Sequence, residues 1–267
     1  MYQALYRKWR PKVFSDVIGQ EHITETLKKQ VAEGRTSHAY LFTGTRGTGK
    51  TTCAKILAKA VNCEHPVNGD PCCQCPSCLG LESGSFLDVL ELDAASNNGV
   101  DQVRALRDEA IYAPANVKKR VYIVDEVHML STAAFNALLK ILEEPPAHLM
   151  FILATTELHK VPATILSRCQ RYSFKRILPK DIAQRLSYVA GQEHIDLTAD
   201  GAELLSRLAD GALRDGLSLL DQCAAAGGTV DSRAVLEVLG LAGNLQTAQL
   251  MRHILDRNAQ AALLLLN

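Results

Sequence analysis

The chain of 267 residues lacks an excess of charge, since 29 lysines and arginines balance 29 aspartates and glutamates. Any nucleic-acid contact must therefore be a local face rather than a global positive field. No run of about 18 apolar residues occurs, which excludes a conventional transmembrane helix. Residues 1–11 also lack the apolar core of a signal peptide. We therefore expect a cytoplasmic protein without a membrane partner.

Aromatic residues are scarce, at 5% with a single tryptophan, whereas hydrophobic residues of all kinds make up 47% of the chain. This composition suits an α/β protein with an ample core. The length allows one large domain or a few small ones, and no internal repeat or low-complexity tract interrupts the chain.

The first strong motif is a glycine-rich loop between an apolar run at 39–43 and a helical pattern at 52–60. In this context glycines let backbone N–H groups fold around phosphates, and the helix N-terminus adds positive potential. Lys50 is expected to reach the β- and γ-phosphates, and the hydroxyl of Thr51 to take a Mg²⁺ position. The sequence thus predicts a nucleoside triphosphate site. The loop comprises Gly44, Thr45, Arg46, Gly47, Thr48, Gly49, Lys50 and Thr51.

A second motif follows the apolar, β-branched run at 121–124, which is typical of a strand buried on both faces. Asp125 there can help Thr51 to hold Mg²⁺, and Glu126 can orient and deprotonate an attacking water. Two acidic residues at an exposed strand end are the plain alternative. Together with the phosphate loop, the pair favours hydrolysis over passive nucleotide binding.

Five of the eight cysteines lie between positions 63 and 78. In a reducing cytoplasm a disulfide knot is not expected. Four thiolates on tight turns suit a closed, structural Zn²⁺ site, for which the spacing offers Cys63, Cys72, Cys75 and Cys78. An iron–sulfur cluster is the rival, although the fourth cysteine of a ferredoxin run is missing, and unligated thiols are a third alternative. Cys73 is the spare thiol, and it could exchange roles with Cys72.

Strand and helix patterns alternate up to about residue 178, which predicts a parallel sheet with helices on both faces and the phosphate loop at the carboxyl ends of the strands. Only helical patterns follow, and a linker at 240–244 leads into a helix from Leu245 that runs into the apolar stretch 261–266. We expect the chain to stop inside a third domain. The expected strands are 39–43, 86–93, 121–124, 149–154 and 169–174, with helices at 100–111 and after Ser131.

Several segments together resemble the gamma/tau subunits of the bacterial DNA polymerase III clamp loader. They are the phosphate loop, the cysteine module and the residues at 6–11, 124–130, 142–146 and 167–169. The resemblance implies an AAA+ ATPase domain over 1–178 with a zinc module inserted at about 62–80. A helical lid over 179–242 and the start of a helical collar domain over 243–267 follow. It also implies an ATPase subunit of the polymerase III holoenzyme that assembles with delta, delta-prime and further copies of itself to load the beta clamp on primer–template DNA.

The same resemblance implies roles for individual residues. Arg168 matches an arginine finger that completes a neighbouring subunit's ATP site, where phosphoryl transfer spreads negative charge over the γ-oxygens. On the residues alone, a surface salt bridge is the alternative for Arg168. Thr156, with Thr155 as the alternative, matches a sensor of the γ-phosphate, and Arg214 matches a lid arginine that reaches the phosphates. The nucleotide-binding set is completed by Thr52 and by Arg10, Val17 and Ile18, the last three beside the nucleotide base. For Arg10, together with Arg7 and Lys8, a solvated basic face or a DNA contact is the alternative.

For DNA, the candidate is the helix that opens at Asn97-Asn98-Gly99, whose free N–H groups can bind phosphates. A plain N-cap is the alternative. Two other functions stay open: another AAA+ motor, such as a branch-migration helicase, and a nonhydrolysing clamp-loader scaffold. The first calls for a motor-type DNA-binding domain, which is not visible here. The intact catalytic residues, Lys50, Thr51, Asp125 and Glu126, argue against the second.

Overall fold

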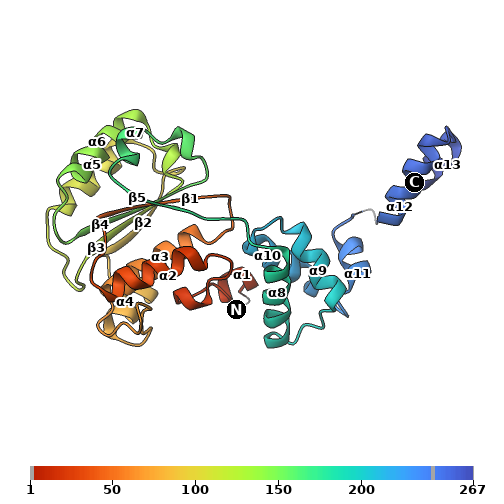
Figure 1. The fold of residues 1–267 in the computed structure, drawn as a ribbon, viewed down its shortest axis with the longest axis horizontal. Helices are drawn as coiled ribbons and strands as arrows, with labels where there is room; N and C mark the ends of the chain where they lie inside the picture. Colours follow the sequence, from red (N-terminus) through yellow and green to blue (C-terminus); the bar gives the residue numbers. More distant parts are fainter. Residues whose placement is uncertain (1–2, 242–243, 267) are drawn as a thin grey trace. The chain divides into compact units, whose positions relative to one another are not determined.

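The computed structural model describes residues 3–241 and 244–266, which form two compact units (Figure 1). The larger unit holds residues 7–178 together with 211–214, and the smaller unit holds the other described residues. Within the described ranges, no helix is long and apolar enough to cross a membrane.

A five-stranded parallel sheet, in the order β2-β3-β4-β1-β5, forms the centre of the larger unit. The strands β1 and β4 are buried along their whole length because helices cover both of their faces. Since β4 lies between β1 and β3, the carboxyl ends of these three strands meet at one edge. The strands are β1 (Ala39–Thr43), β2 (Val89–Asp93), β3 (Arg120–Asp125), β4 (Leu149–Thr155) and β5 (Gln170–Ser173).

Helices lie on both faces of this sheet, as predicted (Figure 1). One face packs into a core that includes Leu138 and Phe151, and the other into a core that includes Leu57 and Phe42. The first face is covered by α5 (Val100–Ala110), α6 (Thr132–Glu143) and α7 (Ala163–Leu166), and the second by α2 (Glu21–Ala32) and α3 (Lys50–Asn62). Shorter elements are α1 (Leu5–Lys8), η1 (Phe14–Asp16), α4 (Pro76–Ser83), η2 (Val127–Met129) and η3 (Leu158–Lys160).

Helix α6 shows how local sequence sets the boundaries of these elements. The backbone N–H of Ala134 donates to Oγ of Ser131 at 3.2 Å, which caps the first turn as predicted. The apolar stripe that contains Phe135 and Leu142 faces the core. The helix ends at Glu143, shortly before two consecutive prolines that cannot continue it.

The strand predicted over 86–93 begins only at Val89. Phe86 packs instead against α4, where a Cβ on Gly80 would lie 2.5 Å from the phenyl ring. The buried carboxylate of Asp88 accepts the backbone N–H groups of Ala115 and Asn116 at 3.2 and 3.1 Å. These contacts hold the residues before Val89 in a turn.

The smaller unit is built of helices, as predicted. Its buried contacts include Ile182, Leu186 and Leu205. Part of the linker predicted at 240–244, namely residues 242 and 243, lies outside the described residues. The helices are α8 (Pro179–Gln192), α9 (Ala199–Leu208), α10 (Leu213–Ala225), α11 (Ser232–Val238), α12 (Asn244–Leu255) and α13 (Ala259–Leu266).

The single helix predicted from Leu245 into the apolar stretch 261–266 is wrong, because the chain forms two helices there. Arg257 adopts a positive φ of 55°, which a continuous right-handed helix does not allow. Asn258 then caps the second helix, since its Oδ1 accepts the backbone N–H of Ala261 at 3.1 Å. That this pair begins a third domain stays a prediction.

Candidate active site

The glycines of the phosphate loop are required by both conformation and space. Gly44, Gly47 and Gly49 have φ values of 141°, 78° and 103°, which residues with a side chain rarely adopt. A Cβ on Gly44 would lie 2.5 Å from the carbonyl oxygen of Phe174, and one on Gly47 would lie 2.6 Å from Cβ of Ala212. The loop can therefore bring its backbone close to a ligand, as a phosphate cradle needs.

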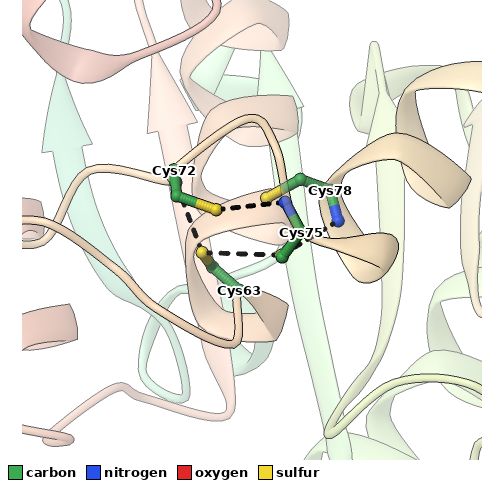
Figure 2. Close-up of side chains that lie close together, drawn as sticks. All are labelled: Cys63, Cys72, Cys75 and Cys78. Atoms are coloured by element: carbon green, nitrogen blue, oxygen red, sulfur yellow. Dashed lines mark hydrogen bonds between the residues drawn. The ribbon is translucent and has the colours of Figure 1, made fainter.

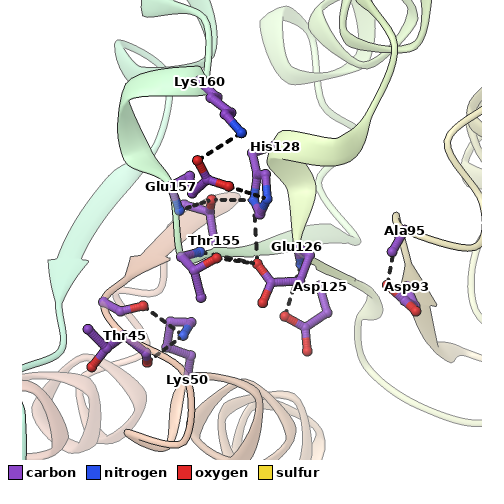
Figure 3. Close-up of polar contacts among 12 residues, drawn as sticks. Thr45, Lys50, Asp93, Ala95, Asp125, Glu126, His128, Thr155, Glu157 and Lys160 are labelled. Atoms are coloured by element: carbon purple, nitrogen blue, oxygen red, sulfur yellow. Dashed lines mark hydrogen bonds and ion pairs between the residues drawn. The ribbon is translucent and has the colours of Figure 1, made fainter.

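Lys50 begins helix α3 and folds back over this loop (Figure 3). Its Nζ donates to the carbonyl oxygens of Gly44 and Thr45, each at 2.9 Å. Burial lowers the pKa of Lys50, and the nearby carboxylates of Glu126 and Asp125 oppose that shift. The amine of Lys50 thus lies at the loop, where the motif predicts a group that binds the β- and γ-phosphates.

Thr51 and Asp125 meet although they are 74 positions apart in the chain, since the Thr51 hydroxyl donates to Oδ2 of Asp125 at 2.7 Å. The sheet order explains the contact, because β1 and β3 end on either side of β4. A hydroxyl and a carboxylate are oxygen ligands of the kind that Mg²⁺ prefers. The pair therefore fits the predicted magnesium site.

Glu126 lies just beyond β3 in a left-handed conformation, with φ of 48°. For a residue other than glycine this conformation costs about 1 to 3 kcal/mol and is typical of functional sites. Its Oε2 accepts the backbone N–H and the hydroxyl of Thr156 at 3.2 and 2.9 Å (Figure 3). The end of β4 thus holds the carboxylate that the sequence predicts to be the base.

The two candidate sensor threonines point to different partners. Thr156 contacts Glu126, whereas the hydroxyl of the buried Thr155 lies 2.9 Å from Nδ1 of His128. A role for either residue in sensing the γ-phosphate stays a prediction. His128, which the sequence analysis did not assign, is therefore part of the network around the carboxylate.

The residues expected beside the nucleotide base lie near the phosphate loop and the start of α3. Nε of Arg10 donates to Oγ1 of Thr52 at 3.2 Å. A Cβ on Gly49 would lie 3.9 Å from Cγ1 of the buried Val17, and Ile18 is half-buried. Their contact with a nucleotide base stays a prediction.

Gln20 is a second residue that the sequence analysis missed. Its buried side-chain amide donates to the carbonyl oxygens of Thr48 and Lys175 at 3.4 and 2.7 Å, and its Oε1 accepts the Lys175 N–H at 3.1 Å. Gln20 thereby ties the phosphate loop to the segment that follows β5. A single buried amide has no sequence motif, so only the fold reveals this role.

Arg168 lies between α7 and β5, and its side chain is 33% exposed. One guanidinium nitrogen donates to Oε1 of Glu143 at 2.6 Å and the other to the carbonyl oxygen of Thr164 at 2.7 Å. The strands β1 and β5 are parallel, so Arg168, which precedes β5, lies toward the amino ends of the strands, whereas the phosphate loop follows the carboxyl end of β1.

Arg214 belongs to the short segment 211–214, which groups with the larger unit although the adjoining helices do not. Within that segment Ala212 approaches Gly47 of the phosphate loop. The backbone beside Arg214 therefore borders the loop. Its contact with phosphates stays a prediction.

The cysteine cluster joins the end of α3, where Cys63 is the C-cap, to the start of α4, where Cys75 is the N-cap and Cys78 lies in the first turn. Figure 2 shows the four side chains close together. The sulfur atoms of Cys63, Cys72, Cys75 and Cys78 all lie within 4.8 Å of one another, and those of Cys63 and Cys75 are 3.9 Å apart. Four thiolates at about 2.3 Å from a tetrahedral zinc are about 3.8 Å apart. The cluster therefore has the dimensions of a closed zinc site.

The structure decides between Cys72 and Cys73. Cys73 has a positive φ of 57°, and its sulfur faces the carbonyl oxygens of Lys12 and Pro71 at 3.8 and 3.6 Å, outside the cluster. Backbone N–H groups of Gln74 and Cys75 lower the pKa of Cys72 to about 6. The shift favours the thiolate form that binds metal at Cys72, whereas burial raises the pKa of Cys63 and Cys78, whose protons a bound metal would displace.

The N-terminus of α5 is the predicted DNA contact. Its N-cap residue is Gly99, and no side chain caps it. The side-chain amide of Asn97 donates instead to the carbonyl oxygen of Asp93 at 3.2 Å. Gly99 is thus a plain N-cap without a side-chain hydrogen bond, and the DNA contact stays a prediction.

Comparisons with known proteins agree with this geometry. The model for the DNA polymerase III delta subunit matches residues 19–178, and that for the ATPase lid domain of the clamp loader subunit matches residues 181–229. The chain is 52% identical over its full length to the DNA polymerase III subunit tau of Bacillus subtilis and 46% identical to that of Escherichia coli. It spans 47% and 42% of these two relatives, which is less than half of each.

Among solved structures, RuvB, the Holliday junction branch migration motor of Thermotoga maritima, matches with a TM-score of 0.65. The match covers 92% of this chain and 79% of that one, at 18% identity, so it shows a shared fold alone. The chain is also 42% identical over its full length to the DNA polymerase III subunit gamma of Buchnera aphidicola, of which it spans 74%. These identities show more than the fold: the chain belongs to the gamma/tau family of bacterial DNA polymerase III clamp-loader subunits.

Proposed function

We propose that this chain is the ATP-hydrolysing motor subunit of the replicative clamp loader. It would couple ATP binding and hydrolysis to the loading of the beta sliding clamp on primer–template DNA, in an assembly with delta, delta-prime and further copies of itself. The observation that carries this proposal is the contact between Thr51 and Asp125 beside Lys50 and Glu126. A scaffold that only bound nucleotide would not need the strained, hydrogen-bonded Glu126.

The proposed division of labour follows from the chemistry of each group. The loop N–H groups and Lys50 bind the β- and γ-phosphates, and Thr51 and Asp125 hold magnesium, which supplies charge neutralisation at the phosphate oxygens. Glu126 accepts a proton from the attacking water. Arg10, Val17 and Ile18 are the residues proposed to lie beside the nucleotide base of ATP.

The site needs one further charge, which the neighbouring subunit supplies through Arg168. Action in trans is supported by the partly exposed side chain of Arg168 and by its place before β5, at the strand end opposite to the phosphate loop. Arg168 must then leave its ion pair with Glu143 and contact the γ-phosphate bound by the neighbouring subunit. Thr156 and Arg214 are proposed to report the nucleotide state to the rest of the chain.

The remaining parts serve structure and DNA. We assign a structural Zn²⁺ to the four clustered cysteines, whose size and thiolate chemistry fit it. The uncapped N-terminus of α5 is proposed to contact phosphates of primer–template DNA without reading its sequence.

ATP turnover tests the proposal in four mixtures: the chain alone, with delta and delta-prime, with the beta clamp added, and with primed DNA added. We expect slow turnover by the chain alone and strong stimulation when clamp and primed DNA are both present. Absent turnover in every mixture would favour the nonhydrolysing scaffold. Stimulation by four-way junction DNA without the clamp would favour a branch-migration motor.

A further inference from the structure

His128 is a buried ring beside the proposed base, with a side chain that is only 6% exposed. It lies in η2, two residues after Glu126. In Figure 3 the ring lies between the carboxylates of Glu126 and Glu157. None of the roles assigned so far uses it.

Both ring nitrogens of His128 face oxygen atoms. Nδ1 lies 2.9 Å from Oγ1 of Thr155 and 3.4 Å from Oε2 of Glu126. On the other side, Nε2 lies 3.4 Å from Oε1 of Glu157. Glu157 is itself held by Nζ of Lys160 at 2.8 Å. A chain of polar contacts thus runs from Lys160 through Glu157 and His128 to Glu126.

The tautomer of His128 decides which of its ring nitrogens is a donor. The hydroxyl of Thr155 already accepts the backbone N–H of Glu157 at 3.0 Å, and an ionised carboxylate can only accept. With the proton on Nδ1, the ring can donate toward Glu126 and Thr155; with the proton on Nε2, it would donate toward Glu157 and accept the Thr155 hydroxyl at Nδ1. The first tautomer is the one that a positioning role requires, with Nδ1–H facing Oε2 of Glu126 at 3.4 Å.

We propose that His128 is a positioning residue for Glu126. Its Nδ1–H acts with Thr156 on Oε2 and thereby leaves Oε1, which points away from His128, to receive the proton of the attacking water (Figure 3). The backbone of Glu126 is fixed by its left-handed conformation, but the flexible side chain needs contacts of its own to hold one orientation. This inference rests on the proposed role of Glu126 in ATP hydrolysis.

Two substitutions of His128 separate the two ring nitrogens. The amide nitrogen of Asn lies near the place of Nδ1, so His128→Asn keeps a donor toward Glu126. The longer Gln places its amide near Nε2, so His128→Gln keeps only the contact with Glu157. In the assembled loader with primed DNA, we expect His128→Asn to retain turnover within about threefold. His128→Gln should lower kcat about tenfold with KM unchanged, a part of the 10²- to 10⁴-fold that a general base contributes.

A double-mutant cycle with Glu126→Gln gives the decisive readout. If His128 acts only through the carboxylate, His128→Gln lowers kcat in the native background and has no further effect on the residual turnover of Glu126→Gln. ATP affinity and the thermal unfolding midpoint are measured for every variant as controls.

Equal kcat for His128→Asn and His128→Gln, or the same loss in both backgrounds, would overturn the positioning role while leaving the proposed function intact. Absence of turnover in the unsubstituted assembly, with ATP still bound, would instead overturn the proposed function itself. A fall in the unfolding midpoint that accounts for the lost activity of His128→Gln would show that His128 is structural.

Discussion

The triphosphate site and the cysteine cluster lie in the same unit but are built in different ways. The first gathers residues from the ends of three strands, between positions 44 and 156. The second uses only the segment 63–78. In the first case the sheet order determines the geometry, and in the second the chain must be held together locally.

The packing around the cysteines shows what holds them. Among the side chains that the structure describes, the buried cluster consists of the cysteines themselves, with Cys72 packed against Cys63, Cys75 and Cys78. Polar contacts tie the segment to the rest of the unit: the carboxylate of Asp70 accepts the N–H of Phe14 at 2.6 Å, and Nζ of Lys118 donates to the carbonyl oxygen of Cys63 at 2.7 Å. Changes in the first site should therefore alter chemistry and spare the fold, and changes in the second should do the reverse.

The largest effect should come from a residue that neither site contains. Arg168→Ala should lower turnover of the assembled loader by about 10³-fold or more, because the transition-state charge loses its partner in trans. ATP affinity of the isolated chain should stay nearly unchanged. Subunit mixing provides the control, since a chain with Glu126→Gln and intact Arg168 should support hydrolysis at the adjoining native site. If turnover survives in the assembled Arg168→Ala protein, the finger assignment is wrong.

Lys50→Ala tests whether the triphosphate site can lose its affinity for ATP while the protein keeps its fold. Removing a charged donor from the β- and γ-phosphates should weaken ATP binding about 10- to 100-fold, and clamp loading should fail. Equilibrium titration with a fluorescent ATP analogue measures the first effect. The unfolding midpoint without nucleotide should change little. Unchanged affinity would mean that Lys50 does not reach the phosphates.

Cys75→Ser tests the opposite behaviour in the locally built site. We expect about one zinc per native chain, colourless and without the visible absorbance of an iron–sulfur cluster. The substitution should reduce zinc content and the unfolding midpoint together and impair ATP chemistry only indirectly. Cys73→Ser is the matched control and should keep its zinc, since its sulfur lies outside the cluster. Stoichiometric iron, or equal metal loss in both variants, would contradict the assignment.

Glu143→Gln should have the smallest effect. The pair of Glu143 with Arg168 is partly exposed, and such pairs contribute about 1 kcal/mol or less. Releasing Arg168 should raise turnover in the assembled loader by up to about fivefold, because Arg168 no longer has to break its pair with Glu143 before it contacts the phosphate of the neighbouring site. The isolated chain should show no change. A fall in assembled turnover would mean that Glu143 helps to place the finger.

The sequence predicted most of what depends on contiguous motifs. Lys50 and Glu126 follow strand patterns that also determine where those strands end, so their meeting could be anticipated. Cys72 and Cys73 could not be separated by spacing, because the left-handed backbone at Cys73 decides which sulfur faces the cluster. Arg257 gave no sign that it would break the last helix.

Gln20 and His128 stayed hidden for a different reason. Each acts through side-chain contacts with residues that are distant in the sequence, such as Lys175 for Gln20 and Thr155 for His128. A lone buried amide or imidazole follows no spacing rule. Only the packed fold shows which polar groups these side chains satisfy.

Glu126→Gln in the assembled loader, with clamp and primed DNA, tests the central claim most directly. The substitution keeps the shape of the side chain and removes the base, so the dissociation constant of ATP should stay nearly unchanged while kcat falls by about 10²- to 10⁴-fold. A kcat equal to that of the native assembly would contradict the account, because the proton of the attacking water would then be taken by another group.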